Sequence, residues 1–237
     1  MKYNSLHFSS IDSTNKYLKD NFENLSDFTF VSADYQTQGK GRNDRIWIAK
    51  EKENLLFSLL IKDQDIIKDG AFLSLVAAVS VSEVLEKYHL SNVQIKWPND
   101  IYMNNKKIVG ILLEGRVPDY LVIGIGINVN QKCFDGEYRK EPTSMFLELN
   151  KYTDIDELKE SVYETLFTNL NNYSSNKEIF LKYFKNHDYL LDKQVNYVFG
   201  GNTFTGIVKG IDENFNIIIE TNGEERHISS GEIELLK

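Results

Sequence analysis

The sequence predicts an α+β protein, with a larger mixed domain over residues 1–189 and a small β-barrel over residues 190–237. Helix-like and strand-like segments are interspersed up to about residue 189. Beyond that point, short strand-like runs alternate with turn signals, which is typical of a small barrel. Hydrophobic residues make up 41% of the 237 residues and charged residues 26%, so the chain has enough apolar mass for packed cores.

Helical spacing of apolar side chains predicts four helices in the larger domain, at residues 12–24, 69–88, 155–173 and 176–187. Asp12 or Ser13 can cap the first helix. The second has the spacing of an amphipathic helix, with one apolar stripe toward the core.

Apolar and β-branched runs predict strands in the larger domain at residues 28–33, 54–62, 93–97, 107–114 and 120–129. A polar, glycine-containing loop at residues 36–46 separates the first two strands. The C-terminal strands are predicted at residues 194–199, 203–211, 215–221, 225–229 and 232–236. Asn222-Gly223 lies between two of them and is a strong signal for a two-residue hairpin.

Charge and cysteine content exclude several classes of protein. The chain has 27 Lys and Arg against 35 Asp and Glu, a net charge of −8, which argues against a non-specific nucleic-acid binder. A single cysteine, Cys133, allows neither an intramolecular disulfide nor a cysteine-based zinc site, so we expect a reducing cytoplasm. The N-terminus has no signal-peptide pattern, and no apolar run reaches the roughly 20 residues of a membrane helix.

The loop at residues 39–45 (GKGRNDR), with Trp47 after it, combines glycines with three cations. Glycine permits close approach of the backbone to a ligand, and the cations can neutralise phosphate oxygens. A solvated turn with scattered charge is the competing interpretation. The P-loop pattern is absent.

Two further segments place polar or charged residues at the end of, or inside, a predicted apolar strand. In residues 96–100 (KWPND), Asn99 and Asp100 suit a turn after proline, and Asp100 could also lie near a ligand. Lys107 enters a strongly apolar strand, where it can reach solvent or carry a fixed charge into a cleft. Gly110 in the same strand indicates close approach of a ligand or of another backbone.

Two more short motifs are weak when each is taken alone. Gly124 and Gly126 leave one face of a strand bare, which makes room for a flat ligand. Ser13, Thr14 and Asn15 could bind a polar head group, although helix capping explains Ser13 equally well. The four histidines show no metal-ligand spacing, and we predict no protein metal site.

Taken in order, these motifs resemble the biotin–protein ligases, also called biotin–[acetyl-CoA-carboxylase] ligases. The resemblance covers essentially the whole chain, and its most specific parts are KWPND with KxxGIL and the glycine-rich basic loop. It implies a mixed-sheet catalytic domain of the biotin/lipoate ligase type, followed by an SH3-like barrel. It also implies two reactions: biotin and ATP give biotinyl-5′-adenylate and pyrophosphate, and a lysine of a biotin carboxyl carrier domain then takes the biotin. ATP and biotin are thus expected substrates, with Mg²⁺ as the accompanying cation.

The resemblance also implies residue roles by position. Lys107 and Arg42 are the expected catalytic residues. The expected biotin-binding residues are Ser13, Thr14, Asn15, Gln36, Lys40, Gly41, Arg42, Lys107, Gly110, Gly124 and Gly126. The expected nucleotide-binding residues are Arg42, Arg45, Trp47, Asn99, Lys107 and Asn128.

The sequence departs from the family's usual loop, GRGRRGR, at three positions. Lys40 and Asn43 replace arginines, and Asp44 replaces a glycine, so the stiffness of the loop and its ligand affinity are open. Because Ser13-Thr14-Asn15 comes almost at the start, we expect the ligase-only form, without an N-terminal DNA-binding domain and without DNA as a partner.

Three alternatives to this prediction are a lipoate–protein ligase of the same fold, a DNA-binding regulator that senses the adenylate, and a non-catalytic biotin-binding protein. The polar set for a ligand head group argues against the first, the net charge against the second, and the presence of Lys107 and Arg42 against the third. No membrane partner is expected, and a homodimer is left open.

Overall fold

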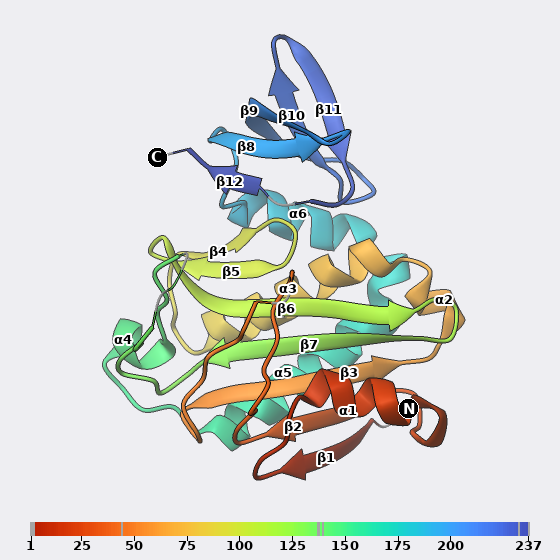
Figure 1. Ribbon diagram of the computed structural model, residues 1–237, viewed down its shortest axis with the longest axis vertical. Helices are drawn as coiled ribbons and strands as arrows, with labels where there is room; N and C mark the ends of the chain where they lie inside the picture. The colour runs from red at the N-terminus through yellow and green to blue at the C-terminus, as the bar shows by residue number, and fades with distance from the viewer. Residues whose placement is uncertain (1–2, 44, 137, 139, 232, 237) are drawn as a thin grey trace.

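The computed structural model describes residues 3–43, 45–136, 138, 140–231 and 233–236. A seven-stranded sheet forms the centre of the larger part, in the order β1-β2-β3-β7-β6-β5-β4 (Figure 1). Its strands are β1 (Asn4–Phe8), β2 (Thr29–Ala33), β3 (Asn54–Ile61), β4 (Val93–Lys96), β5 (Asp100–Met103), β6 (Lys106–Arg116) and β7 (Tyr120–Asn128). β1 and β2 are parallel and the other neighbours are antiparallel, so the sheet is mixed, as predicted.

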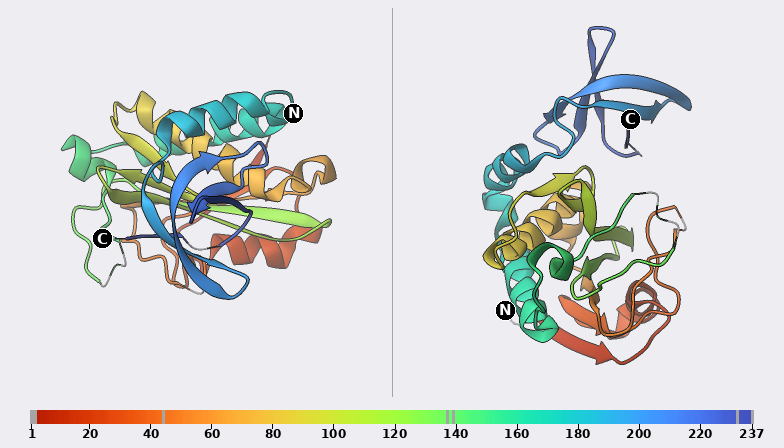
Figure 2. Two further views of the ribbon diagram at one scale, coloured as in Figure 1. Left: turned by 90° about the horizontal axis from the view of Figure 1, so that it is seen from above. Right: turned by 90° about the vertical axis from the view of Figure 1, so that its left-hand side faces the viewer.

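Helices lie on both faces of this sheet, as Figure 2 shows. One face carries α1 (Thr14–Asn21), which contacts β3 and β7. The other face carries α3 (Gly70–Lys87) and α5 (Ile155–Asn172), which pack on each other. The remaining helices are α2 (Gln64–Ile67), α4 (Met145–Leu149), α6 (Lys177–His187) and the 3-10 segments η1 (Phe22–Asn24) and η2 (Tyr173–Ser175).

Two predicted helices differ from those observed. The first begins at Thr14 with Ser13 as its cap, and its last turn is the 3-10 segment η1. The second, α3, is not amphipathic: apart from Glu83, every residue from Phe72 to Leu85 is buried. The sheet, α5 and α6 surround α3. Two of its serines therefore donate to backbone carbonyls, Ser74 Oγ to Pro98 at 2.8 Å and Ser80 Oγ to Val76 at 2.7 Å.

The C-terminal strands form a second sheet, which is five-stranded and antiparallel. In the order β11-β10-β9-β8-β12, its strands are β11 (Glu224–Ile228), β10 (Ile217–Thr221), β9 (Asn202–Ile211), β8 (Gln194–Phe199) and β12 (Ile233–Leu235). The predicted hairpin is confirmed, with Asn222 and Gly223 both at positive φ. The predicted α+β class is therefore confirmed, while the division at residues 189 and 190 remains a prediction.

The second sheet is packed against the end of the first. Trp97 Nε1 donates to the carbonyl oxygen of Phe215 at 2.9 Å, and the rings of Tyr102 and Tyr189 stack with centroids 4.6 Å apart. These contacts attach the turn between β9 and β10, and the segment before β8, to the β4–β5 end of the first sheet (Figure 1).

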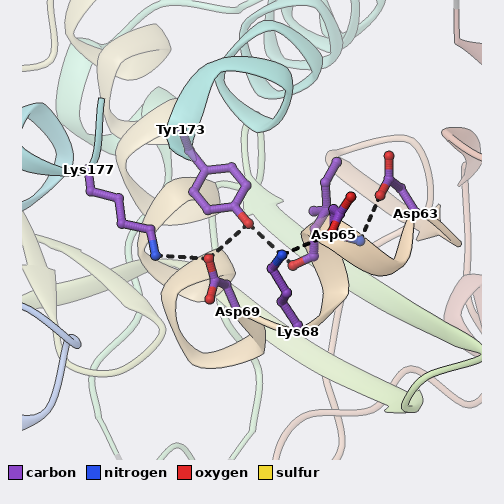
Figure 3. A network of polar contacts seen from close by, with 7 residues as sticks. Asp63, Asp65, Lys68, Asp69, Tyr173 and Lys177 are labelled. Atoms are coloured by element: carbon purple, nitrogen blue, oxygen red, sulfur yellow. Dashed lines mark hydrogen bonds and ion pairs between the residues drawn. The ribbon is translucent and has the colours of Figure 1, made fainter. Parts of the chain in front are cut away.

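A polar network on the helical side ties the start of α3 to η2 and α6 (Figure 3). Asp69 accepts hydrogen bonds from Tyr173 Oη at 3.1 Å and from Lys177 Nζ at 2.9 Å. Among the helices built from the described residues, none combines the length and apolar character needed to cross a bilayer.

Candidate active site

A cavity of about 800 Å³ opens on the α1 side of the central sheet. It is enclosed by α1, β6, β7, the loop around residues 36–48, the turn between β4 and β5, parts of residues 134–142, and β12. Every site residue predicted from the sequence lines it: Ser13, Thr14, Asn15, Gln36, Lys40, Gly41, Arg42, Arg45, Trp47, Asn99, Lys107, Gly110, Gly124, Gly126 and Asn128. The structure therefore brings together segments that are more than 100 residues apart in the chain.

The start of α1 supplies a chain of hydrogen-bonding groups to this cavity. Gln36 Oε1 accepts from the backbone N–H of Thr14 at 2.8 Å, and Thr14 Oγ1 lies 2.6 Å from Ser58 Oγ. Ser58 Oγ donates to Asn15 Oδ1 at 2.5 Å. Thr14, Asn15 and Ser58 are all buried, so these bonds hold their side chains in fixed orientations.

Asn15 is also anchored from the sheet. Its Nδ2 donates to Glu114 Oε2 at 2.8 Å, and Lys19 Nζ lies 2.5 Å from Glu114 Oε1. Burial raises the pKa of Glu114, but the hydrogen bonds from Lys19 and Asn15 outweigh this and hold the pKa below its ordinary value. Glu114 is therefore an ionised carboxylate at neutral pH.

Three glycines form a floor on β6 and β7, but the face they leave bare is not empty. A Cβ at Gly124 would lie 2.1 Å from Asn15 Oδ1, and a Cβ at either Gly110 or Gly126 would lie 2.6 Å from the Trp47 ring. Gly110 and Gly126 are cross-strand partners. Asn15 and Trp47 therefore rest on these three glycines, which also line the cavity.

Lys107 reaches the same face through an irregularity in β6. The pairing of β5 with β6 shifts register between Ile101 and Tyr102, so Ile108 is an extra residue on β6. Without that bulge, Lys107 and Gly110 would point to opposite faces, since they are three residues apart. Lys107 Nζ lies 2.6 Å from Asp100 Oδ1 and 5.6 Å from the centre of the Trp47 ring.

The basic loop forms a small hairpin at the mouth of the cavity. Lys40 and Ile46 form a β-bridge, and the N–H of Trp47 donates to the carbonyl of Gly39 at 2.9 Å. Arg42 donates to Asn99 Oδ1 at 3.3 Å and to the carbonyl oxygen of Gly231 at 3.0 Å. The loop therefore touches both sheets. Asp44, one of the departures noted above, lies outside the described residues.

Cations outnumber carboxylates around the cavity, although the whole chain is acidic. Among the described lining residues the cations are Lys40, Arg42, Arg45, Lys96, Lys107 and Lys140. The carboxylates among the same residues are Asp100 and Glu234. A local excess of positive charge of this kind favours an anionic ligand.

Asn128 lies at the edge of the cavity with its amide already in use, because its Nδ2 donates to the carbonyl oxygen of Thr143 at 2.9 Å. By contrast, Trp47 Nε1 and Tyr138 Oη are buried and make no hydrogen bond to any described residue. Both residues line the cavity, but Trp47 Nε1 itself lies against Gly126 on β7. No cluster of three or more potential metal ligands occurs among the described residues.

The lining residues that were not predicted from the sequence include Ser58, Phe134, Tyr138, Lys140, Pro142, Ile233, Glu234 and Leu235. Ser58 could have been found, because a lone serine in the apolar run LLFSLLI is a visible anomaly. Nothing local in the sequence marks the three residues around Glu234, which reach the cavity through the packing of the second sheet.

Comparison with known proteins agrees with this geometry. A family model described as the biotin/lipoate A/B protein ligase family matches residues 7–128, and one described as the biotin protein ligase C-terminal domain matches residues 190–236. The chain is 30% identical over 230 residues to the bifunctional ligase/repressor BirA of Salmonella typhimurium, which covers 95% of this chain and 72% of that protein. It is 32% identical over 221 residues to BirA of Bacillus subtilis, covering 90% of this chain and 67% of that protein.

Solved structures show the same relationship. The biotin protein ligase from Aquifex aeolicus in complex with biotin and ATP superimposes with a TM-score of 0.88 at 33% identity, covering 99% of each chain. The chain therefore belongs to the biotin/lipoate A/B protein ligase family.

Proposed function

We propose that this protein is an ATP-dependent biotin–protein ligase that works in two steps. The carboxylate of biotin attacks the α-phosphate of ATP, which gives biotinyl-5′-adenylate and releases pyrophosphate. A lysine amine of a biotin carboxyl carrier domain then attacks the acyl carbon, which gives an amide and releases AMP. The observation that carries the proposal is one cavity that joins a polar, buried hydrogen-bonding set to a group of cations.

The order of groups along β6 and β7 suits a molecule with a polar head and an acidic tail. Asn15 rests on Gly124, whereas Trp47 and Lys107 lie at Gly126 and its partner Gly110. Two residues along a strand span about 6.5 Å. A head group held by Asn15 would therefore place a short acyl chain past the Trp47 ring, which covers Gly110 and Gly126, with its carboxylate directed toward Lys107.

The cations supply what the first step requires. A carboxylate and a triphosphate are both anions, and negative charge on the α-phosphate grows during the attack. Lys107 and Arg42 line the cavity as fixed positive charges, which lower the barrier for such a step. Mg²⁺, when bound, would offset phosphate charge; it is commonly held by substrate phosphates and one or two carboxylates, a role that Asp100 could fill.

The loop at residues 39–47 suits the protection of a reactive anhydride from water. It is closed on itself by the contact of Trp47 with Gly39, and it reaches the second sheet through Arg42. Opening these few hydrogen bonds would admit substrates, and closing them would exclude water.

The choice of acid tests the proposal directly. Incubation with α-labelled ATP and either biotin or lipoate should give labelled adenylate with biotin and far less with lipoate. Adenylate with lipoate alone would favour the lipoate ligase, and tight binding of biotin without adenylate would favour a non-catalytic binding protein.

We further propose that the partner is a carrier domain in a reducing cytoplasm and that the chain does not bind DNA specifically. The net charge of −8 supports the second point, since duplex binding depends on displacing counterions with a basic surface. In a gel-shift experiment at physiological salt, retention of one duplex over a scrambled duplex would contradict it.

A further inference from the structure

Glu114 lies beneath the polar end of the cavity and does not itself line it. Both of its oxygens are occupied, one by Asn15 Nδ2 at 2.8 Å and the other by Lys19 Nζ at 2.5 Å. Glu114 has no role in the two-step reaction described above. Its position next to Asn15 nevertheless decides how the end of the cavity can form hydrogen bonds.

An ionised carboxylate can accept hydrogen bonds but cannot donate them. The amide nitrogen of Asn15 must therefore face Glu114, and its Oδ1 must face the opposite way, toward Ser58 Oγ at 2.5 Å. Ser58 has a single hydroxyl proton, which this bond uses. The 2.6 Å contact between Ser58 Oγ and Thr14 Oγ1 then needs the proton of Thr14. Gln36 Oε1, at 3.1 Å from Thr14 Oγ1, is the more distant acceptor for that proton.

The hydroxyl protons of Thr14 and Ser58 and one amide proton of Asn15 thus form a row directed toward Glu114. Thr14 Oγ1, Asn15 Oδ1 and Gln36 Oε1 are left with lone pairs as their remaining hydrogen-bonding capacity. Ser13 Oγ accepts from the N–H of Lys16 and keeps its own proton to donate. The end of the cavity therefore offers several acceptors and one hydroxyl donor.

We propose that Glu114 is a positioning residue that fixes the Asn15 amide and so makes the cavity selective for a cyclic urea. A urea ring carries two N–H donors and one carbonyl acceptor, which complements acceptors at Thr14 and Asn15 and the donor at Ser13. This inference rests on the proposed function and deepens it by naming the group that sets head-group specificity. An uncharged side chain at position 114, or an amide that can turn its own N–H toward Asn15, would let the Asn15 amide rotate and direct its N–H toward Ser58.

Glu114→Gln tests this with little change in shape. The glutamine amide has one oxygen and one NH₂ group, so its NH₂ must face either Asn15 Nδ2 or Lys19 Nζ, which are both donors. The orientation of the Asn15 amide is then no longer fixed. By calorimetry, biotin should bind roughly 10- to 100-fold more weakly, the scale expected when a buried hydrogen-bonding group is misaligned. At saturating biotin, kcat and the KM for ATP should stay close to the wild-type values. Glu220→Gln is the matched control, because Glu220 is also a strand carboxylate paired with a lysine, at 3.2 Å from Lys209 Nζ.

A specificity ratio separates positioning from a merely structural role. The probe is a biotin analogue methylated on one urea nitrogen, which lacks one N–H donor. The wild-type protein should strongly prefer biotin over this analogue, and the preference should shrink in Glu114→Gln. If Glu114→Gln kept the wild-type affinity for biotin and the wild-type preference over the analogue, the role of Glu114 would be refuted and the proposed function would stand. Absence of biotin binding by the wild-type protein would overturn the proposed function together with it.

Lys19→Met provides a second route if Glu114→Gln does not fold. Loss of the Lys19 ammonium should raise the pKa of Glu114, whose other nearby groups are Asn15 and the Lys40 charge. Biotin affinity should then decline on acidification at a higher pH than in the wild type. Lys16→Met is the control on the same helix, since Lys16 pairs with Asp12 and Asp20 instead. Identical pH profiles for all three proteins would overturn the inference.

Discussion

Replacing Lys107 with alanine removes the positive charge that lies closest to Asp100 in the cavity. The ammonium is 2.6 Å from Asp100 Oδ1, and the two side chains are only 28% and 21% exposed. At an effective dielectric constant of about 20, a charge pair separated by about 4 Å is worth about 4 kcal/mol. Each 1.36 kcal/mol is a tenfold change in rate, so losing such an interaction with the α-phosphate slows adenylate formation by roughly 10²–10³-fold.

Lys106→Ala is the matched control. Lys106 is the adjacent lysine, but its Nζ pairs with Glu141 at 2.6 Å, and both side chains are well exposed. Exposed ion pairs of this kind contribute about 1 kcal/mol or less of interaction free energy. We therefore expect Lys106→Ala to change the rate of adenylate formation by less than about fivefold.

Single-turnover formation of biotinyl-adenylate, measured for both variants side by side, is the appropriate assay. Thermal unfolding should show that both variants fold, since neither lysine is part of a core. Preformed biotinyl-adenylate should restore part of the transfer by Lys107→Ala, because the activation step is then bypassed. Equal and mild effects of the two substitutions would refute the assignment and leave Arg42 as the better candidate.

Three other predictions follow from the geometry. Gly124→Ala should weaken biotin binding at least about tenfold, because the added Cβ would meet Asn15 Oδ1. Gly70→Ala is the control, since a Cβ there would have no neighbour within 4 Å. Equal biotin affinities of the two variants by calorimetry would contradict this. Amide exchange at loop residues 39–43 should slow when biotin is added, and unchanged rates would argue against loop closure. Burial raises the pKa of Asp188 to about 6 from 3.8, so the free energy of unfolding should rise as the pH falls from 7 to 4. Asp188→Asn should remove this dependence and stabilise the protein at pH 7 by up to about 3 kcal/mol in urea denaturation; an unchanged slope would contradict it.

Local sequence signals predicted most of the fold. Hydrophobic periodicity and turn residues gave the strands of both sheets to within a few residues, with two exceptions. β1 (NSLHF) is a polar, exposed edge strand without an apolar pattern, and β5 is four residues long and directly follows a turn. The burial of α3 on all sides could not be predicted, because it depends on which elements pack around the helix.

For the candidate site, the sequence identified the residues but not their contacts. Each motif reached the cavity because the motifs lie on β6, β7, α1, the loop between β2 and β3 and the turn between β4 and β5. The bulge at Ile108, which turns Lys107 toward Gly110, has no local signature. The contact of Arg42 with Gly231 depends on how the second sheet docks on the first, which no local pattern encodes.

Ligase activity is tested most directly by intact-mass spectrometry of a biotin carboxyl carrier domain after incubation with this protein, biotin and Mg·ATP. A biotin–protein ligase should add one biotinyl group, located by fragmentation on a single lysine, and only when ATP is present. An unmodified carrier domain, in a reaction where the protein is folded and ATP is present, would contradict the proposed function.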